Sequence, residues 1–224
     1  MRVTLEQGPA FTLARVGLTR GESVRAESGA MVSMSGSVEI ATKMQGGLLS
    51  AIARKVLTSE SFFQNTFTAA RGPGEVTFAP SLPGDIRVRE MRGETLVLQS
   101  GAYLASDPSI TIETSWGGAR GFFGREGLFL LRATGEGPLL FCSYGAIVEV
   151  DVPPEGYVVD TGHVVAFEPS LQWDVTRVGG LKSTLFSGEG LVSRFTGSGT
   201  LWLQTRSFDA FIGTITPHLS RSSQ

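Results

Sequence analysis

The chain has 224 residues, of which 29 are glycine, 18% are charged and 41% are hydrophobic, and its formal net charge is −2. The apolar share is sufficient for a hydrophobic core, the glycine content argues against a helical bundle, and the charge gives no basic field for nucleic acid or anionic lipid. The single cysteine, Cys142, excludes an internal disulfide framework and a cysteine-cluster metal site. With no secretory leader and no apolar run of about 18 residues, we expect a cytoplasmic protein.

The predicted elements, taken in chain order, follow one plan three times. Residues 11–34, 86–106 and 147–167 each contain a strand, a turn, a second strand that ends in Ser-Gly or Thr-Gly, and a third strand. The glycines of those pairs are Gly29, Gly101 and Gly162. Because so many landmarks recur in one order, we predict three tandem repeats within a single compact unit. Their expected boundaries are residues 8–80, 84–143 and 145–206, and residues 207–224 are expected to form a C-terminal tail.

Each repeat continues with a Gly-Gly pair, a variable loop and two β-rich runs separated by a glycine-bearing turn, which is the pattern of a hairpin. Polar and apolar residues alternate over 86–89 and 148–152, as in strands with one buried face. The one helix we expect is near residues 48–57, where Leu48, Ile52 and Val56 share a face. The predicted fold class is therefore all-β with one short inserted helix. Because repeats of about 65 residues are marginal alone, we expect them to share a core in a pseudo-threefold arrangement.

Several stretches carry a resemblance to a known family. ESGAMVSMSGSVEI, LQSGAYLASDPSITIE, DTGHVVAFEPSLQWDV and the loop-strand segments that follow them resemble a widespread family of bacterial and archaeal proteins. Its fungal relative is the altered-inheritance-of-mitochondria protein of the mitochondrial inner membrane. The resemblance covers the chain from Phe11 to Arg206. Family members are similar in fold to the trp RNA-binding attenuation protein, which implies double-stranded β-helix-like units in a trefoil. The family has no established catalytic residues to carry over.

The residues themselves give no catalytic or metal-binding pattern. His163 and His218 lie far apart and show no H-x-H or H-E-x-x-H spacing, which argues against a cupin-like metal site. Cys142 lies in the apolar run PLLFCSY, which is typical of a buried thiol. No nucleophile elbow, Walker loop or dinucleotide loop is present in the sequence. We therefore predict no catalytic, cofactor-binding or metal-binding residue, and a protein that is not an enzyme.

One glutamate opens the last strand pair of each repeat, at Glu60, Glu126 and Glu189. On a pseudo-threefold axis these three candidate carboxylates would converge and bind a cation. The interpretation that we favour is structural, with each glutamate accepting backbone hydrogen bonds at the start of its strand pair.

The loop after each Gly-Gly pair is unusually apolar and is accompanied by basic residues. Apolar side chains on glycine-flanked loops are candidates for an interface, because such a loop seldom builds a core by itself. Three interpretations stay open: a plug for the loop's own β-unit, a contact between identical chains, and a surface for another protein or a membrane. The candidate interface residues are Leu48, Leu49, Ile52, Phe122, Phe123, Leu181, Leu185 and Phe186.

The sequence therefore predicts a non-enzymatic interaction or scaffold protein that forms homo-oligomers. Analogy with the mitochondrial relative suggests a membrane-organising role. The alternative is a small-ligand or RNA-binding protein that uses crevices between repeats, as the attenuation protein binds tryptophan between its subunits. Nucleic acid is disfavoured, because Lys43, Lys55 and Lys182 form no repeated set and the net charge is negative.

Overall fold

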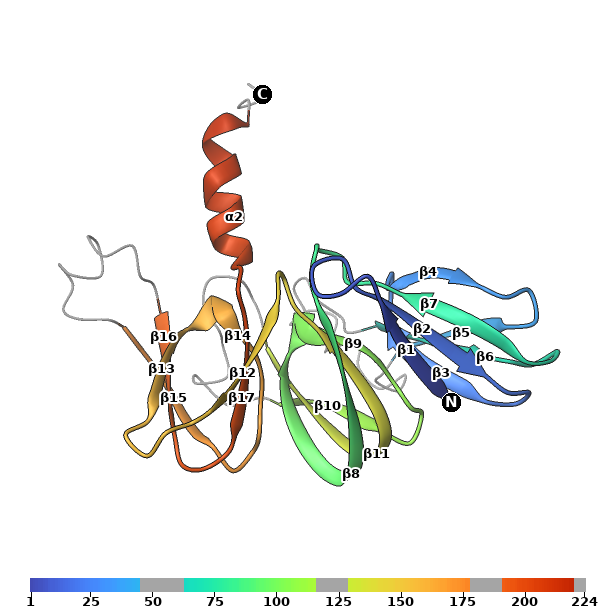
Figure 1. The fold of residues 1–224 in the computed structure, drawn as a ribbon, viewed down its shortest axis with the longest axis horizontal. Helices are drawn as coiled ribbons and strands as arrows, with labels where there is room; N and C mark the ends of the chain where they lie inside the picture. Colours follow the sequence, from blue (N-terminus) through green and yellow to red (C-terminus); the bar gives the residue numbers. More distant parts are fainter. Residues whose placement is uncertain (45–62, 116–128, 178–190, 220–224) are drawn as a thin grey trace, which may run out of the picture.

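The computed structural model describes residues 1–44, 63–115, 129–177 and 191–219. This part of the chain is built almost entirely of antiparallel strands, which confirms the all-β prediction. The strands form three lobes that follow one another along the chain (Figure 1). The helix predicted near residues 48–57 lies outside the described residues.

The first lobe contains seven strands in two sheets. They are β1 (Arg2–Glu6), β2 (Leu13–Leu18), β3 (Ser23–Glu27), β4 (Met31–Met34), β5 (Glu39–Met44), β6 (Phe63–Thr68) and β7 (Gly74–Phe78). One sheet has the order β1-β2-β7-β4, and the other contains β3-β6-β5. Strand β2 shows why the chain forms a sheet here: Ala14, Val16 and Leu18 are buried, and the residues between them are half-buried.

The second lobe contains two long strands, each of which covers the positions of two strands in the first lobe. Its elements are β8 (Ile86–Gln99), the 3₁₀ turn η2 (Ser100–Ala102), β9 (Tyr103–Ser106), β10 (Thr111–Ser115) and β11 (Leu130–Cys142). Strands β8 and β11 pair along nearly their whole length, with a bulge between Thr134 and Glu136. Gly93, Gly135 and Gly137 have φ of 98°, 147° and 104° at this bend, a region that favours glycine.

The third lobe pairs its strands in the same order as the first. Its elements are β12 (Ile147–Asp151), β13 (Tyr157–Asp160), the 3₁₀ turn η5 (Thr161–His163), β14 (Val164–Phe167), β15 (Gln172–Arg177), β16 (Leu191–Thr196) and β17 (Thr200–Gln204). Strand β12 pairs with β17 as β2 pairs with β7, and β13 pairs with β16 as β3 pairs with β6. After β17 come α2 (Phe208–Ile215) and the 3₁₀ turn η6 (Thr216–His218).

The expected hairpins were wrong. Strands β6 and β7 belong to different sheets, as do β16 and β17, and β11 runs through its glycine-bearing segment without a chain reversal. The glycines let the chain bend from one sheet to the facing one, and a bend of this kind has the same sequence pattern as a tight turn.

Two short strand pairs connect the lobes. Strand β3 pairs with β9, and β8 pairs with β14, so that strands from all three lobes join one ten-stranded sheet. Strands β4 and β13 each lie at the edge of a sheet. They lie at opposite ends of the molecule's long axis (Figure 1). The predicted closure of three repeats into a trefoil stays a prediction.

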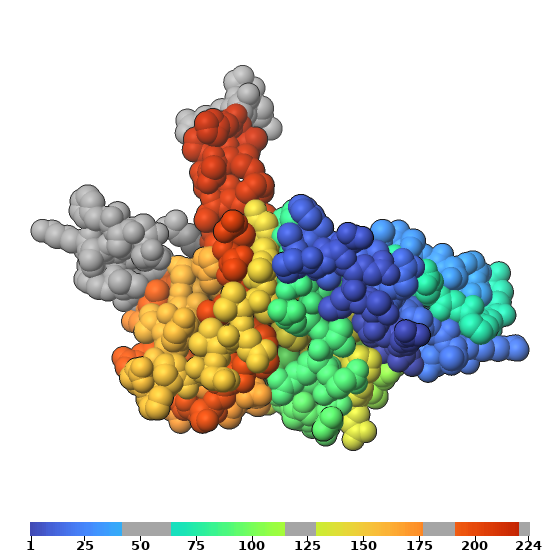
Figure 2. Space-filling view, viewed as in Figure 1, coloured from blue at the N-terminus to red at the C-terminus, as the bar shows by residue number. Residues whose placement is uncertain are grey.

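Hydrophobic clusters cross the boundaries between lobes. The first cluster contains Phe67 and Phe78 of the first lobe, whose ring centroids are 5.3 Å apart, together with Ile86 and Leu140 of the second. The third cluster contains Phe195 of the third lobe and Val97 of the second. Figure 2 shows the second lobe, in green, directly against the first lobe, in blue, and the third, in orange and red.

The segments between lobes meet in one hydrogen-bonded junction. The N–H of Thr12 donates to the carbonyl of Gly84 at 3.0 Å, and the N–H of Asp85 donates to the carbonyl of Gly145 at 3.0 Å. The buried Asp85 carboxylate accepts the Thr12 hydroxyl at 3.1 Å and its neighbouring backbone N–H, from Ile86, at 2.9 Å. A Cβ on Gly84 would lie 1.7 Å from the carbonyl oxygen of Ser143, so only glycine fits this position.

Candidate interaction surfaces

The residues that the sequence singled out for an interface lie outside the described part of the chain. This holds for all eight apolar loop residues and for Glu60, Glu126 and Glu189. Their roles therefore stay predictions, and the surfaces below are built from other residues.

Of the thiol and two histidines that the sequence weighed for chemistry, Cys142 and His163 contact backbone carbonyl groups. Burial raises the pKa of the Cys142 thiol well above its usual range, so this thiol stays protonated near neutral pH. The half-buried His163 lies with Nδ1 2.7 Å from the carbonyl oxygen of Gln204, which links η5 to β17. Among the described residues, no group of three or more His, Cys, Asp or Glu side chains is arranged to hold a metal ion.

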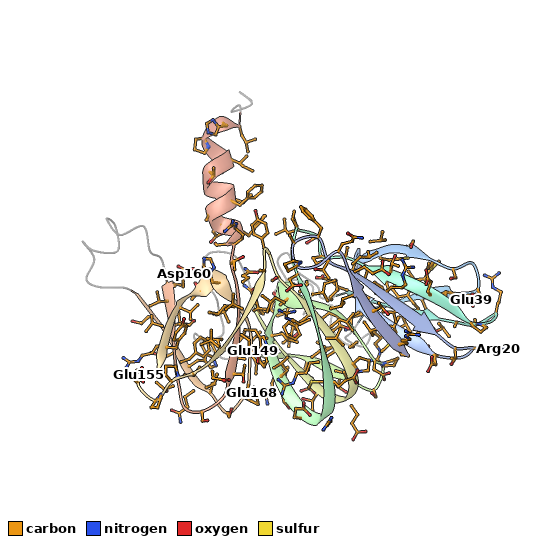
Figure 3. All side chains as sticks on the ribbon, viewed as in Figure 1. Arg20, Glu39, Glu149, Glu155, Asp160 and Glu168 are labelled. Atoms are coloured by element: carbon orange, nitrogen blue, oxygen red, sulfur yellow. The ribbon has the colours of Figure 1, made fainter. Side chains whose placement is uncertain are left out.

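The boundary between the second and third lobes carries a polar cluster whose members bind one another. The guanidinium of Arg89 lies 5.3 Å from the ring centre of Trp202, donates to Glu168 at 3.1 Å and lies 3.5 Å from Glu94. The indole N–H of Trp202 donates to Glu149 at 2.9 Å. Glu149 and Glu168 both come from the third lobe and lie beside this boundary (Figure 3). The alternative of a ligand or RNA crevice between repeats stays a prediction.

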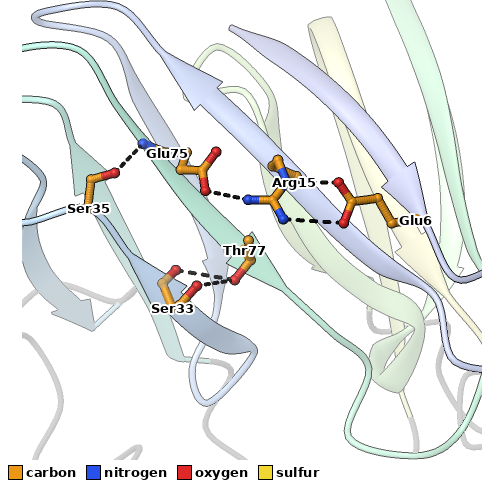
Figure 4. A network of polar contacts seen from close by, with 6 residues as sticks. All are labelled: Glu6, Arg15, Ser33, Ser35, Glu75 and Thr77. Atoms are coloured by element: carbon orange, nitrogen blue, oxygen red, sulfur yellow. Dashed lines mark hydrogen bonds and ion pairs between the residues drawn. The ribbon is translucent and has the colours of Figure 1, made fainter.

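The sheet that ends at β4 is held together by cross-strand polar contacts on its outer face (Figure 4). Arg15 on β2 donates to Glu6 on β1 at 2.8 and 3.3 Å and to Glu75 on β7. Further along, the hydroxyls of Thr77 on β7 and Ser33 on β4 are 2.7 Å apart. The hydrogen bonds and charge of Arg15 lower the pKa of the Glu6 carboxyl. These contacts fix β4 in the sheet although it is an edge strand.

The edge strands β4 and β13 expose apolar side chains. In β4, Val32 is 59% exposed and Met34 is 39% exposed, and all four residues of the strand are exposed. In β13, Val158 is 59% exposed. Neither strand contains the lysine or proline that commonly protects an edge from pairing.

Helix α2 is the second exposed apolar element. The one helix that the sequence predicted is near residues 48–57, so the prediction missed α2, which lies in the expected C-terminal tail. The Ser207 side chain accepts the N–H of Ala210 at 3.4 Å and caps the first turn, and Asp209 adds a favourable negative charge there. The signal was present, because apolar residues recur at positions 208, 211, 212 and 215, the spacing of one helix face. Eight residues are too few for that pattern to stand out.

The helix extends away from the β-framework (Figure 1), and none of its residues is buried. Phe208, Phe211 and Ile212 are between 41 and 45% exposed. The ring centroid of Phe211 is 6.0 Å from that of Tyr144, so the base of the helix touches the segment that enters the third lobe. In the described part of the chain, no helix is both long enough and apolar enough to cross a membrane.

The architecture defines the class of protein: a lobed antiparallel β-protein with two exposed apolar elements. Residues 3–206 match the family model of mitochondrial biogenesis AIM24, and the chain therefore belongs to the AIM24 family. It is 32% identical over 231 aligned residues to an uncharacterised protein of Streptococcus pyogenes serotype M6, with 100% of this chain and 93% of the relative covered.

A crystal structure from Streptococcus pyogenes is similar to the chain throughout. It superposes with a TM-score of 0.81 at 32% identity, and the match covers 97% of this chain and 99% of that one. The resemblance to the altered-inheritance-of-mitochondria family is thus confirmed. The similarity in fold to the trp RNA-binding attenuation protein stays a prediction.

Proposed function

We propose that this protein is a non-enzymatic interaction or scaffold protein that uses helix α2 to dock on another macromolecule. The observation that supports this proposal is the exposed apolar face of α2. An unburied stripe that contains Phe208, Phe211 and Ile212 costs free energy in water unless a partner covers it. Apolar anchors at this spacing are those of a helix that binds in a groove or lies on a lipid surface.

The scaffold that carries α2 is, in this proposal, made of three tandem double-stranded β-helix-like repeats. The recurring strand pairs support it: β2 with β7, the first half of β8 with the second half of β11, and β12 with β17. The short strands β4, β9 and β14 each also have a one-residue register shift against the strand beside them. The strand pairs between lobes, β3 with β9 and β8 with β14, join the lobes into a rigid platform for the docking helix.

We expect the protein to work in the cytoplasm, with α2 bringing it to a membrane surface. Support comes from the amphipathic helix and from analogy with the family's description as mitochondrial biogenesis proteins. The membrane-organising role would then follow from holding a platform against lipid.

The test compares the α2 variant Phe208→Ser/Ile212→Ser with Ala210→Ser. Ala210 lies on the other side of the same helix and is also exposed, so its replacement controls for the lower helix propensity of serine. Each protein is floated with vesicles of phosphatidylcholine, with and without cardiolipin, and is used for affinity capture from native lysate. We expect flotation of the parent and of Ala210→Ser, and loss of flotation for the double variant. The proposal is wrong if all three proteins bind lipid and lysate partners equally, or if none of them binds either.

A further inference from the structure

We propose that strand β12 accepts an extended basic segment of another protein as an added strand, in the place that β1 takes beside β2. This interaction surface is separate from α2 and goes beyond the docking role proposed above. Among the described strands, β12 has only β17 beside it, so one side of β12 is open. In the bound segment, apolar residues would alternate with lysine or arginine.

The first step is that β2 and β12 hold equivalent places in their lobes. Strand β2 pairs with β7, and β12 pairs with β17, both in antiparallel register. Val16 lies opposite the residue two positions after Gly74. Val150 lies opposite the residue two positions after Gly199. The two glycines have the same setting, because a Cβ on either would lie 2.6 Å from a serine hydroxyl oxygen. Val16 and Val150 are therefore at equivalent positions, and so are the residues two positions before them.

The second step is the burial of the residues at these positions. In the first lobe, Ala14 and Val16 are fully buried. Their counterparts in the third lobe differ, since Val148 is 44% exposed and Val150 is half-buried. The first lobe is covered by β1, which lies along β2 and packs Val3 against the first cluster. The third lobe thus has the apolar residues of a covered strand, but none of the described strands covers them.

The second lobe has charged side chains at the corresponding positions, which are Arg87 and Arg89 of β8. The residues opposite them on β11 stand four and two positions after Gly137. Long charged side chains on an edge oppose pairing with a further strand. Strand β12 has valines at these positions, so its edge lacks this protection.

The third step is the direction of the backbone hydrogen-bonding groups. The N–H of Val152, directly after β12, donates to the carbonyl of Gly199 at 3.0 Å and so points toward β17. Because residues of an antiparallel strand alternate between the two sides in their hydrogen bonding, the N–H and C=O groups of Glu149 and Asp151 point to the open side. An extended segment would therefore make its main-chain hydrogen bonds with these two residues, as in other cases of strand addition to a sheet edge.

The fourth step is charge, which identifies the kind of segment. Residues 147–160 contain four acidic residues and no lysine or arginine. Three of the four are exposed, and they are Glu149, Asp151 and Glu155. Figure 3 shows Glu149 and Glu155 on the third lobe. An acidic edge attracts a basic segment and repels an acidic one, so charge selects the partner.

The register of β1 on β2 gives the order of residues in the segment. Apolar residues of β1 lie opposite Ala14 and Val16. On β12, the same register places apolar residues opposite the two valines and the remaining residues opposite Glu149 and Asp151. A basic residue opposite each carboxylate forms the kind of pair that stabilises antiparallel strands. The expected order is therefore basic, apolar, basic, apolar, beginning opposite Asp151.

The chain's own β1 is already bound in the first lobe. The N-terminal amine of Met1 lies 2.7 Å from the Glu22 carboxylate, and Arg15 on β2 donates to Glu6 on β1 at 2.8 Å. These contacts hold β1 beside β2, so the segment that β12 accepts comes from a different polypeptide.

The experiment measures binding of a fluorescein-labelled peptide, Lys-Arg-Val-Lys-Leu-Lys, to the full chain by fluorescence anisotropy. Its middle four residues have the predicted order. The protein variants are Val148→Ser and Asp151→Lys. The matched controls are Ile40→Ser on β5 and Glu113→Lys on β10, which replace exposed residues of other edge strands. A second peptide has serine in place of valine and leucine, and a third has glutamate in place of arginine.

We expect the first peptide to bind the parent and both controls equally, and each β12 variant to raise the dissociation constant about 10-fold or more. The glutamate peptide is expected to prefer Asp151→Lys to the parent. A parent that does not bind the first peptide overturns the proposal. Equal binding of the serine peptide also overturns it, because charge alone would then account for the attraction.

Amide hydrogen exchange followed by NMR tests the geometry of the bound peptide. The peptide should slow exchange at Glu149 and Asp151 and leave Val148 and Val150 unchanged, because their N–H groups point toward β17. Slower exchange only at other strands places the peptide elsewhere and excludes the site. Light scattering gives a last check: a protein mass that falls when peptide is added would mean that a second copy had occupied β12, which also excludes the proposal.

These results are independent of the test of α2. The Phe208→Ser/Ile212→Ser variant is expected to bind the peptide like the parent, and Val148→Ser and Asp151→Lys are expected to float with vesicles like the parent. Failure of one proposal therefore leaves the other measurable.

Discussion

The junction around Gly84 makes a quantitative prediction for the variant Gly84→Ala. The new Cβ would lie 1.7 Å from the carbonyl oxygen of Ser143 and 2.8 Å from its carbonyl carbon, so the backbone must move apart by more than 1 Å. This movement breaks the hydrogen bonds from Asp85 N–H to Gly145 (3.0 Å) and from Ser143 N–H to Asp85 (3.1 Å). Each lost bond costs about 1 kcal/mol, and more where a buried group is left unpaired.

Alanine also raises the free energy of unfolding by about 0.4–1 kcal/mol, because it reduces the conformational entropy of the unfolded chain. Because each of the two breaks leaves a buried group unpaired, each costs roughly 1.5 kcal/mol, and the expected net loss in the free energy of unfolding is about 2–2.5 kcal/mol. This corresponds to a Tm lowered by roughly 5–10 °C for a domain of this size. The assay is urea unfolding followed by circular dichroism, with calorimetry for Tm. The control is Gly36→Ala, because nothing lies within 4 Å of a Cβ at Gly36. A Gly84→Ala protein as stable as Gly36→Ala would refute the reasoning.

Three further predictions concern the core, the bend in strand β8 and helix α2. Phe195→Ala removes a fully buried ring whose centroid is 5.3 Å from that of Phe167, and should cost about 3–5 kcal/mol in urea unfolding, whereas the exposed Phe11→Ala should stay within about 0.5 kcal/mol. The N–H of Arg92 and the charge of Arg89 lower the pKa of the Glu94 carboxyl, so its contribution is present above the unfolded pKa of about 4.3 and is lost as the pH falls through the lowered folded value. Glu94→Gln should therefore reduce stability at pH 7 and flatten the acid limb of a plot of stability against pH; an unchanged limb contradicts this assignment. Gly213→Ala lies in open space within α2 and should stabilise the helix by up to about 1 kcal/mol, seen as slower amide hydrogen exchange in residues 208–215.

The strands were predictable because their signal is local. Alternating burial in β2 and β3 and the apolar run of β14 follow directly from the order of residue types. The direction of the chain between strands was not predictable in the same way. A glycine with positive φ allows both a tight reversal and a bend into the facing sheet, and only the pairing of distant strands decides between them.

The Ser-Gly and Thr-Gly pairs show a related limit. Gly29 has a φ of 92°, which favours glycine, whereas Gly101 and Gly162 lie in 3₁₀ turns without a positive φ. One motif therefore marks equivalent places in the chain while adopting two backbone conformations. The sequence carried no information on these conformations.

The exposed surfaces were the hardest part to predict. The sequence of β4, MVSM, reads like that of a buried strand, and the equivalent strands β9 and β14 are buried. What differs is the presence of a preceding lobe, which is a property of the whole assembly and not of the four residues. For the same reason, the sequence predicted an interface at the apolar loops and none at these edge strands.

The most direct test of the account is amide hydrogen exchange in residues 208–215 of α2, measured with and without vesicles of phosphatidylcholine and cardiolipin. Phe208, Phe211 and Ile212 are between 41 and 45% exposed in the free chain, so a lipid surface that covers this face should slow exchange in the helix. We predict slower exchange on addition of vesicles for the parent and for Ala210→Ser, and no change for Phe208→Ser/Ile212→Ser. Equal exchange in the parent with and without vesicles would contradict docking on a membrane through α2.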